Sequence, residues 1–228
     1  MHAKIKKIMF FSTLMLFLVS IFTGCFRKTE DEKEKEEDAY VLEVTLAYKK
    51  ACRKLDFLTA HENLDKLQGI YLSSDNYWKG KRLEKIYLQA VDYIYTQELT
   101  YLFNSDESNI SQQIIILLSD FPIIGTAPME GFAGGYLSIS DIEEIERYAK
   151  SVALYNKVCN KVLDNCIEQG NKSLATKIVR RIKSVPYILD GRKGDVKEGI
   201  KFHDSTSYIK YDKRPIQETQ KKYNSAFN

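Results

Sequence analysis

Residues 140–167 read SDIEEIERYAKSVALYNKVCNKVLDNCI, and this stretch decides the fold class. It begins with a capping box, in which Ser140 stands three residues before Glu143, and Gly170 follows its end. Between them the apolar residues recur at three- and four-residue spacing, which places their side chains on one face of an α-helix. The stretch therefore predicts a long helix that buries one face, made of Ile145, Tyr148, Val152, Tyr155, Cys159, Val162 and Ile167.

The same periodicity continues on both sides of this helix, with breaks near Asp56, Pro122 and Pro186. Sequence signals for strands are few, and only the region around 208–211 is compatible with a small strand pair. The sequence predicts an all-α fold, a compact array of antiparallel helical hairpins over residues 39–188. The further helices are expected from residue 39 to the break near Asp56, and over 57–67, 81–103, 109–118 and 174–182.

From Leu189 onward the composition changes. Gly191, Gly194 and Gly199 lie among lysines, aspartates and glutamates. Glycine-rich charged segments at a chain end have little apolar surface to bury. The sequence predicts a loop-rich C-terminal extension over residues 189–228.

The helical segments also show self-similarity. Placing Ala60 on Ala175 brings Leu64 onto Val179 and Leu67 onto Ile182. This pattern resembles the helix-turn-helix repeats of tetratricopeptide-type solenoids, in which stacked hairpins bury one face on the next. No segment carries the full signature of that family, and the offsets between segments are irregular. Shared amphipathic periodicity without common repeats explains the alignment equally well.

The amino terminus has the features of a secretory signal peptide. Lys4, Lys6 and Lys7 precede an uncharged run over residues 8–22, which ends at small residues before Cys25. The run is shorter than the roughly 20 residues that a helix needs to span a bilayer. We therefore expect residues 1–24 to be a cleaved signal peptide.

Residues 22–25, Phe-Thr-Gly-Cys, resemble the lipobox of bacterial lipoproteins. The resemblance implies that the sulfur of Cys25 carries fatty acids such as palmitate and that Cys25 becomes the first residue of the exported chain. Phe22 departs from the pattern, which usually has Leu at that position. An uncleaved anchor, or cleavage without acylation, are the alternatives. Several acyl chains together anchor a protein stably on a membrane.

After Cys25 the sequence is densely charged as far as Asp38, so residues 25–38 are expected to form a lipidated, solvated tether. Phe26 stands where inner-membrane lipoproteins of enteric bacteria have Asp. The resemblance therefore implies a cell-envelope location and favours the outer membrane in a Gram-negative source. The acidic start of the tether also resembles surface-export signals, so the leaflet stays open.

The charge balance argues against nucleic acid as a partner. The chain has 34 Lys and Arg residues against 31 Asp and Glu residues, and Lys4, Lys6 and Lys7 are the only charged side chains before Cys25. The exported body therefore has equal numbers of each sign, whereas a nucleic-acid binder needs a surplus of basic residues.

No catalytic residue, metal site or cofactor site is predicted. Neither the G-x-S-x-G nor the G-x-x-x-x-G-K-[ST] motif occurs. His61-Glu62 is followed by Asp65, where a zinc protease has a second histidine. The glycine-rich segment 131–135 lacks the lysine of a phosphate-binding loop.

Three cysteines remain beyond the lipidation site. Cys159 and Cys166 share one predicted helix, and seven residues of helical rise put their Cα atoms roughly 10.5 Å apart, too far for a disulfide. Cys52 could pair with either of them, or all three could be buried thiols. The sequence leaves this open.

The segment 121–137 is long, nearly uncharged, and rich in glycine and proline. Ordered loops of this length are often functional, and exposed apolar residues often mark a contact surface. The predicted partner contacts are Ile123, Ile124, Met129, Phe132 and Tyr136. A loop folded back over the core is the alternative.

These observations predict a non-enzymatic lipoprotein whose helical body binds an unidentified envelope protein, as an adaptor or as an exclusion or immunity factor. The alternative is a small-ligand receptor or enzyme with its site at the loop 121–137. Carboxylates of Glu130, Asp141, Glu143 and Glu144 would then supply acid–base chemistry.

Overall fold

The computed structural model describes residues 29–74, 77–105, 109–125, 127, 131–133, 139–187, 201–203, 206–209 and 211–227. The predicted signal peptide 1–24 and the predicted lipidation site Cys25 lie outside these residues. The chain divides into two compact units, Met1–Leu46 and Ala47–Asn228.

In the first unit, helix α2 (Glu30–Arg53) begins earlier than the sequence analysis expects. The Thr29 hydroxyl accepts a hydrogen bond from the Glu32 amide (3.3 Å), and the Glu32 carboxylate accepts one from the Thr29 amide (3.0 Å). This reciprocal pair is a capping box. Three acidic residues in the first turn also complement the positive end of the helix dipole. The expected tether 25–38 is thus helical from Glu30, and the helical region begins before residue 39.

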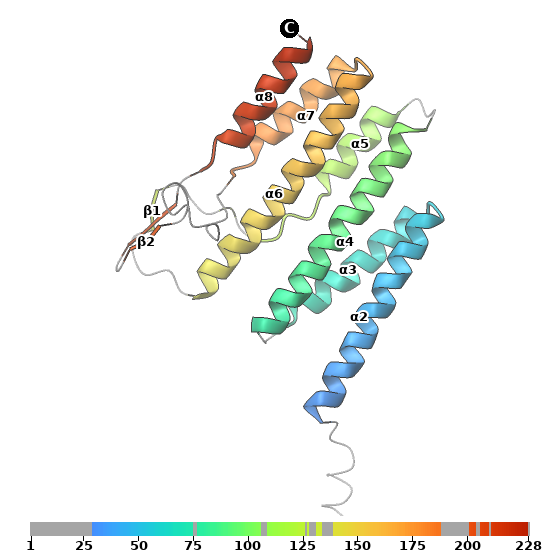
Figure 1. Ribbon diagram of the computed structural model, residues 1–228, viewed down its shortest axis with the longest axis vertical. Coiled ribbons are helices and arrows are strands. Elements are labelled where there is room, and N and C mark those ends of the chain that lie inside the picture. The colour runs from blue at the N-terminus through green and yellow to red at the C-terminus, as the bar shows by residue number, and fades with distance from the viewer. Residues whose placement is uncertain are drawn as a thin grey trace, which may run out of the picture. The chain divides into compact units, whose positions relative to one another are not determined.

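The second unit is built almost entirely of helices, which confirms the predicted all-α fold (Figure 1). The long helix predicted from residues 140–167 is α6, and its buried face contains six of the predicted residues, Ile145 through Val162. After the last two turns of α2 come α3 (Phe57–Leu72), α4 (Tyr77–Phe103), α5 (Ile110–Ser119), α6 (Ile139–Glu168), α7 (Lys172–Ser184) and α8 (Arg214–Phe227).

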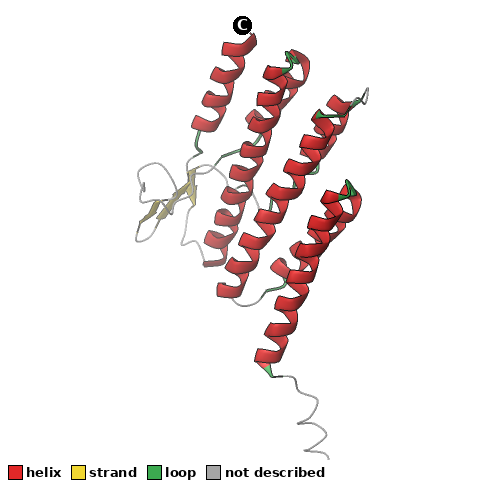
Figure 2. Cartoon of the chain, turned by 45° about the vertical axis from the view of Figure 1, so that its right-hand side comes forward, coloured by secondary structure: helices red, strands yellow, loops and turns green. Residues whose placement is uncertain are grey.

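Helices α4 and α6 form the middle of this unit (Figures 1 and 2). Helix α4 packs against α3, α5 and α6, while α6 packs against α4, α7 and α8. Fully buried side chains of α4, α6 and α7 form the core of the unit, among them Ala90, Val91, Ile94, Val158, Val162, Ile178 and Ile182. None of the helices that the structure describes is both long and apolar enough to cross a bilayer.

The C-terminal extension is only partly loop-like. Its last residues form α8, so the prediction of a loop-rich extension over 189–228 is wrong for this part. The glycine-rich composition covers only the beginning of the extension. Further on, Ile216, Thr219 and Tyr223 recur at helical spacing, and the buried Thr219 lies on the inner face.

A small antiparallel sheet lies beside the helices (Figure 2). Its order is β1-β3-β2, and it consists of β1 (Gly131–Ala133), β2 (Lys201–His203) and β3 (Thr206–Ile209). The region around 208–211, where the sequence allows a small strand pair, overlaps β3 at residues 208 and 209. Strand β1 belongs to the predicted loop 121–137, and its Phe132 is paired with Tyr208. Backbone pairing therefore joins this loop to the C-terminal extension.

Candidate functional site

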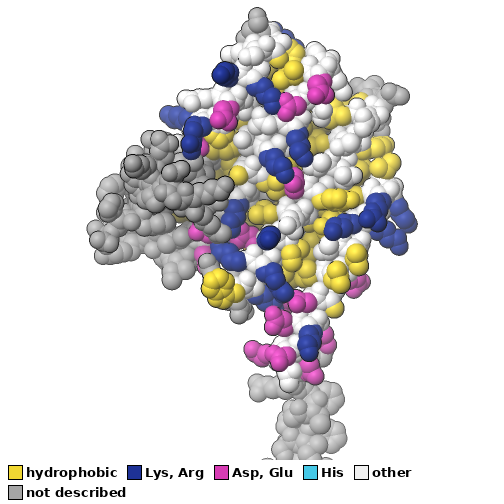
Figure 3. Space-filling model, in the orientation of Figure 1, with side chains coloured by type: hydrophobic (Ala, Val, Ile, Leu, Met, Phe, Trp, Pro, Cys, Tyr) yellow, Lys and Arg dark blue, Asp and Glu magenta, His cyan; other side chains and the backbone are white. Residues whose placement is uncertain are grey.

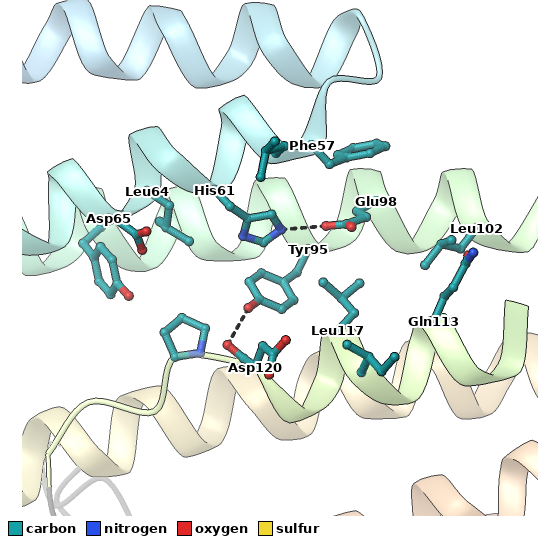
Figure 4. Close-up of a pocket in the computed structure, with 14 residues that line it drawn as sticks. Phe57, His61, Leu64, Asp65, Tyr95, Glu98, Leu102, Gln113, Leu117 and Asp120 are labelled. Atoms are coloured by element: carbon teal, nitrogen blue, oxygen red, sulfur yellow. Dashed lines mark hydrogen bonds and ion pairs between the residues drawn. The ribbon is translucent and has the colours of Figure 1, made fainter.

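The second unit has a groove between α3 and α5, with α4 as its floor (Figure 4). Its volume is about 610 Å³. We call it the α3–α5 groove. The residues that line it are Phe57, Leu58, His61, Leu64, Asp65, Tyr87, Tyr95, Glu98, Leu102, Gln113, Ile116, Leu117, Asp120 and Pro122.

The lining of the groove is mostly apolar, and its rim exposes large aliphatic side chains. Leu64 and Leu117 are buried in the walls. At the rim, by contrast, Leu58 is 75% exposed on α3 and Ile116 is 52% exposed on α5. Facing apolar side chains on two walls are typical of a surface that another molecule covers.

Two hydrogen bonds fix the polar groups of the groove. His61 Nε2 lies 2.7 Å from Glu98 Oε2, which joins α3 to α4. The Tyr95 hydroxyl donates to the backbone carbonyl of Asp120 at 2.9 Å, which joins α4 to the end of α5. The edge of the His61 ring meets the Tyr95 ring at 5.3 Å between centroids. The two walls are thus held at a defined separation through Tyr95 (Figure 4).

Tyr95 also connects the groove to the core. Its ring packs against Phe121 at 4.8 Å between centroids, and Phe121 packs against Tyr155 of α6 at 5.2 Å. Tilted aromatic pairs at these distances are favourable beyond their buried area. Since this row of rings runs from the groove to α6, the floor is rigidly supported.

The groove has an acidic character. Asp65, Glu98 and Asp120 line it, and no Lys or Arg is among its described lining residues. His61 is the only basic partner there, through its bond to Glu98. A cation entering the groove would therefore meet two carboxylates that this histidine does not contact.

Tyr87 adds an unsatisfied polar atom. Its side chain is only 1% exposed, and its hydroxyl has no hydrogen-bond partner in the described part of the chain. Burial raises the pKa of this hydroxyl, so it stays protonated and can both donate and accept. A buried unpaired hydroxyl costs free energy.

The structure separates the predicted contact residues from this groove. Ile123 and Ile124 are half-buried and do not line it, whereas the neighbouring Pro122 does. Phe132 lies in β1, but its side chain is not described. Met129 and Tyr136 lie outside the described residues altogether. A contact through these residues stays a prediction.

The alternative carboxylate site is only partly visible. Glu143 forms an ion pair with Arg147 at 3.6 Å on the same helix, and Glu144 is exposed. The side chains of Glu130 and Asp141 lie outside the described residues.

The described residues include no group of three or more His, Cys, Asp or Glu side chains arranged to hold a metal ion. Cys52, Cys159 and Cys166 are free, buried thiols. Burial raises the pKa of both Cys159 and Cys166 to about 12, and it also raises that of Cys52. Thiols that stay protonated are poor nucleophiles, so these cysteines pack the core.

The groove is not visible in the sequence, because the residues that line it come from three helices that are separate along the chain. One signal for it was nevertheless present. Residues 114–118 of α5 are all apolar, and a helix with a single buried face cannot cover such a run. Ile116 is the residue of this run whose side chain stays exposed to solvent.

Comparison of the chain with protein-family models, with curated protein sequences and with solved structures finds no match.

Proposed function

We propose that the chain is a cell-envelope lipoprotein, anchored through acylated Cys25, and that its helical body binds another protein in the α3–α5 groove. The anchor rests on the resemblance of residues 22–25 to a lipobox. The binding role rests on the groove, because its rim presents Leu58 and Ile116 to solvent above an apolar floor.

An amphipathic helix is the occupant that suits the groove. Two helical walls and a helical floor form a channel, and a fourth helix packs into such a channel by inserting its apolar residues at i, i+3, i+4 and i+7. The volume of about 610 Å³ accommodates several side chains of this kind.

The charges of the groove select the polar side of the occupant. Asp65 on α3 and Asp120 at the end of α5 lie on opposite walls. A Lys or Arg that flanks the apolar face of the incoming helix would pair with one of them, while an acidic residue would be repelled. The partner segment is therefore basic and amphipathic.

Acylation is tested by growing cells with a labelled fatty acid. The wild-type chain should incorporate the label and lose its first 24 residues. Cys25→Ser should remain unlabelled and unprocessed. A wild-type chain without label, cleaved elsewhere or not at all, would disprove the anchor.

Groove binding is tested with two synthetic helical peptides that share one leucine face. In the first peptide the flanking residues are lysine, and in the second they are glutamate. Fluorescence anisotropy should show that the lysine peptide binds at least about tenfold more tightly, the equivalent of one favourable charge pair in a partly buried setting.

Matched variants locate the peptide. Ile116→Glu places a charge on the rim and should abolish binding without affecting folding, since Ile116 is half-exposed. Leu42→Glu, on a residue of similar exposure that does not line the groove, is the control and should bind as the wild type does. Equal affinity in both variants would refute the groove as the binding site.

A small-ligand receptor is the second candidate. The groove volume lies within the range of small-molecule sites, roughly 300–1,000 Å³. Pro122 also links the groove to the predicted loop 121–137. Thermal-shift measurements with cationic amphiphiles and envelope sugars would support this candidate if the stabilisation were lost in Ile116→Glu.

A further inference from the structure

The single tryptophan of the chain has a side chain that is exposed to solvent. Trp78, in the first turn of α4, is 79% exposed. Arg82 and Lys85 follow it by four and seven residues and are exposed as well, so the three side chains form one stripe along the helix. An exposed tryptophan that continues into a basic stripe is uncommon on a surface that faces only water.

The stripe continues into a furrow between α4 and α6, with a volume of about 560 Å³. We call it the α4–α6 furrow. The apolar part of its lining consists of Leu88, Ala153 and Leu154. Dark blue basic side chains extend down the front of α4 and α6 in Figure 3, with apolar side chains between them. The basic residues of the furrow are Lys81, Lys85, Lys150 and Lys157.

The carboxylates at the furrow pair with some of its basic side chains but are fewer than they are. Glu84 is only 4% exposed and is paired with Lys150. Asp92 is paired with Lys157 at 2.5 Å, and Lys81 reaches Glu146 at 3.0 Å. Among the described residues of the stripe and furrow, five basic side chains, with Arg82 included, stand against Glu84, Asp92 and Glu146.

We propose that the Trp78 stripe and the α4–α6 furrow dock the helical body on the anionic phospholipid headgroups of a membrane. Indole rings favour the boundary between headgroups and acyl chains, where the ring is half in apolar surroundings. Lysine and arginine bind lipid phosphates while their aliphatic stems cover apolar surface. The furrow therefore offers both parts of an interfacial contact.

Lipid docking of the helical body goes beyond the proposed function, because it would also orient the α3–α5 groove relative to the membrane. The α4–α6 furrow shares no lining residue with the α3–α5 groove. An anionic membrane surface attracts the basic α4–α6 furrow and repels the carboxylates of the α3–α5 groove. The groove would thus stay accessible to its partner while the body rests on lipid.

Trp78 is itself the reporter for the test. The full chain is reconstituted in vesicles of phosphatidylcholine alone, or of phosphatidylcholine mixed with phosphatidylglycerol. In the mixed vesicles the Trp78 emission should shift to shorter wavelength and should be quenched by lipids brominated near the headgroup. In phosphatidylcholine vesicles the emission should remain that of a water-exposed indole.

Charge reversal separates lipid docking from general charge effects. Arg82→Glu with Lys85→Glu should weaken the docking equilibrium at least roughly 30-fold, since each lost basic side chain costs about a factor of five at an anionic surface and the new carboxylates add repulsion. The control, Lys177→Glu with Lys221→Glu, changes the net charge equally at exposed positions on α7 and α8 and should dock normally.

Identical Trp78 spectra in the two vesicle types would overturn the proposal, as would equal losses in the two double variants. Circular dichroism establishes that all variants are folded. Because none of these readouts depends on the peptide affinity of the groove, a negative result here leaves the peptide-binding test unaffected.

Discussion

Leu55 and Gly170 occupy the same position in two equivalent turns, the first after α2 and the second after α6. Both have a left-handed backbone, with φ of 61° and 66°. In each turn the amide of this residue donates to the carbonyl three residues earlier, and the next amide donates to the carbonyl five residues earlier. These are the two hydrogen bonds of a Schellman motif. Asp56 and Asn171 then cap the helices that follow.

Leucine is an unfavourable residue at such a position. A Cβ atom in the left-handed region costs roughly 1–2 kcal/mol, whereas glycine has no such penalty. Leu55 is also 56% exposed, so its side chain gains little from burial. We expect Leu55→Gly to raise the free energy of unfolding by about 1 kcal/mol, as measured by urea denaturation.

Gly170→Ala is the matched control for that experiment. A Cβ atom at Gly170 would meet nothing within 4 Å, so the substitution tests the backbone conformation alone. It should lower the free energy of unfolding by about 1 kcal/mol. Changes of the same sign in the two variants would contradict the equivalence of the turns.

Gly125 is expected to be intolerant of any side chain. Its φ is 92°, and a Cβ atom there would lie 2.7 Å from the carbonyl oxygen of Glu144 and 3.2 Å from the amide nitrogen of Tyr148. Backbone atoms of a helix cannot move aside cheaply. Gly125→Ala should therefore destabilise the fold by roughly 2–4 kcal/mol, which the thermal midpoint would reveal. A midpoint equal to that of Gly170→Ala would disprove the close approach of this loop to α6.

Tyr87 and Tyr95 line the same groove but differ in the hydrogen bonds of their hydroxyl groups. The Tyr95 hydroxyl donates to Asp120, while that of Tyr87 has no partner among the described residues. Tyr95→Phe should lower the free energy of unfolding by about 1 kcal/mol, because it leaves a carbonyl unpaired. Tyr87→Phe should be neutral or stabilising. Chemical denaturation of the two variants side by side makes the comparison, and a larger loss in Tyr87→Phe would contradict it.

Stability should fall at alkaline pH. Burial raises the pKa of Cys159 and Cys166 from 9.0 to about 12, and that of Tyr71 and Tyr148 from 10.0 to about 12. The unfolded chain therefore releases these protons at lower pH than the folded chain does. The stabilisation is fully present below about pH 9 and is lost as the pH rises towards about 12.

The measurement is the urea midpoint as a function of pH, combined with the ultraviolet absorbance of thiolate and tyrosinate. Ionisation of these four groups should coincide with unfolding. Thiolate absorbance that develops near pH 9.0 in the folded protein would show that Cys159 and Cys166 are accessible.

The helices were predictable where one strong face is buried. Ile145 through Val162 repeat along α6 without interruption, and all the predicted positions between them are buried. The spacing of apolar residues is sufficient to predict α6 because the residues at helical spacing are the same ones that the core buries. The beginning of α2 was missed for the opposite reason. Its first turns have a capping box at Thr29 and many charges, but few apolar residues to mark a face.

The groove was less predictable than the helices. His61 and Glu98 are far apart in the sequence, and their contact depends on how α3 lies on α4. A histidine without a ligand pattern appears as an ordinary surface residue in a single sequence. Trp78 shows the same limit, because its exposure contradicts the usual burial of tryptophan and follows only from the position of the α4 stripe.

Helix α8 closes one side of the hairpin array. It is attached to α6 and α7 through polar contacts as well as apolar ones, for example between Tyr223 and Thr176 at 2.8 Å. Its outer surface is hydrophilic, with Gln217, Glu218 and Lys221 exposed. A stack of hairpins can lengthen only where an apolar face is left uncovered. The polar outer face of α8 therefore offers little apolar surface on which a further hairpin could stack.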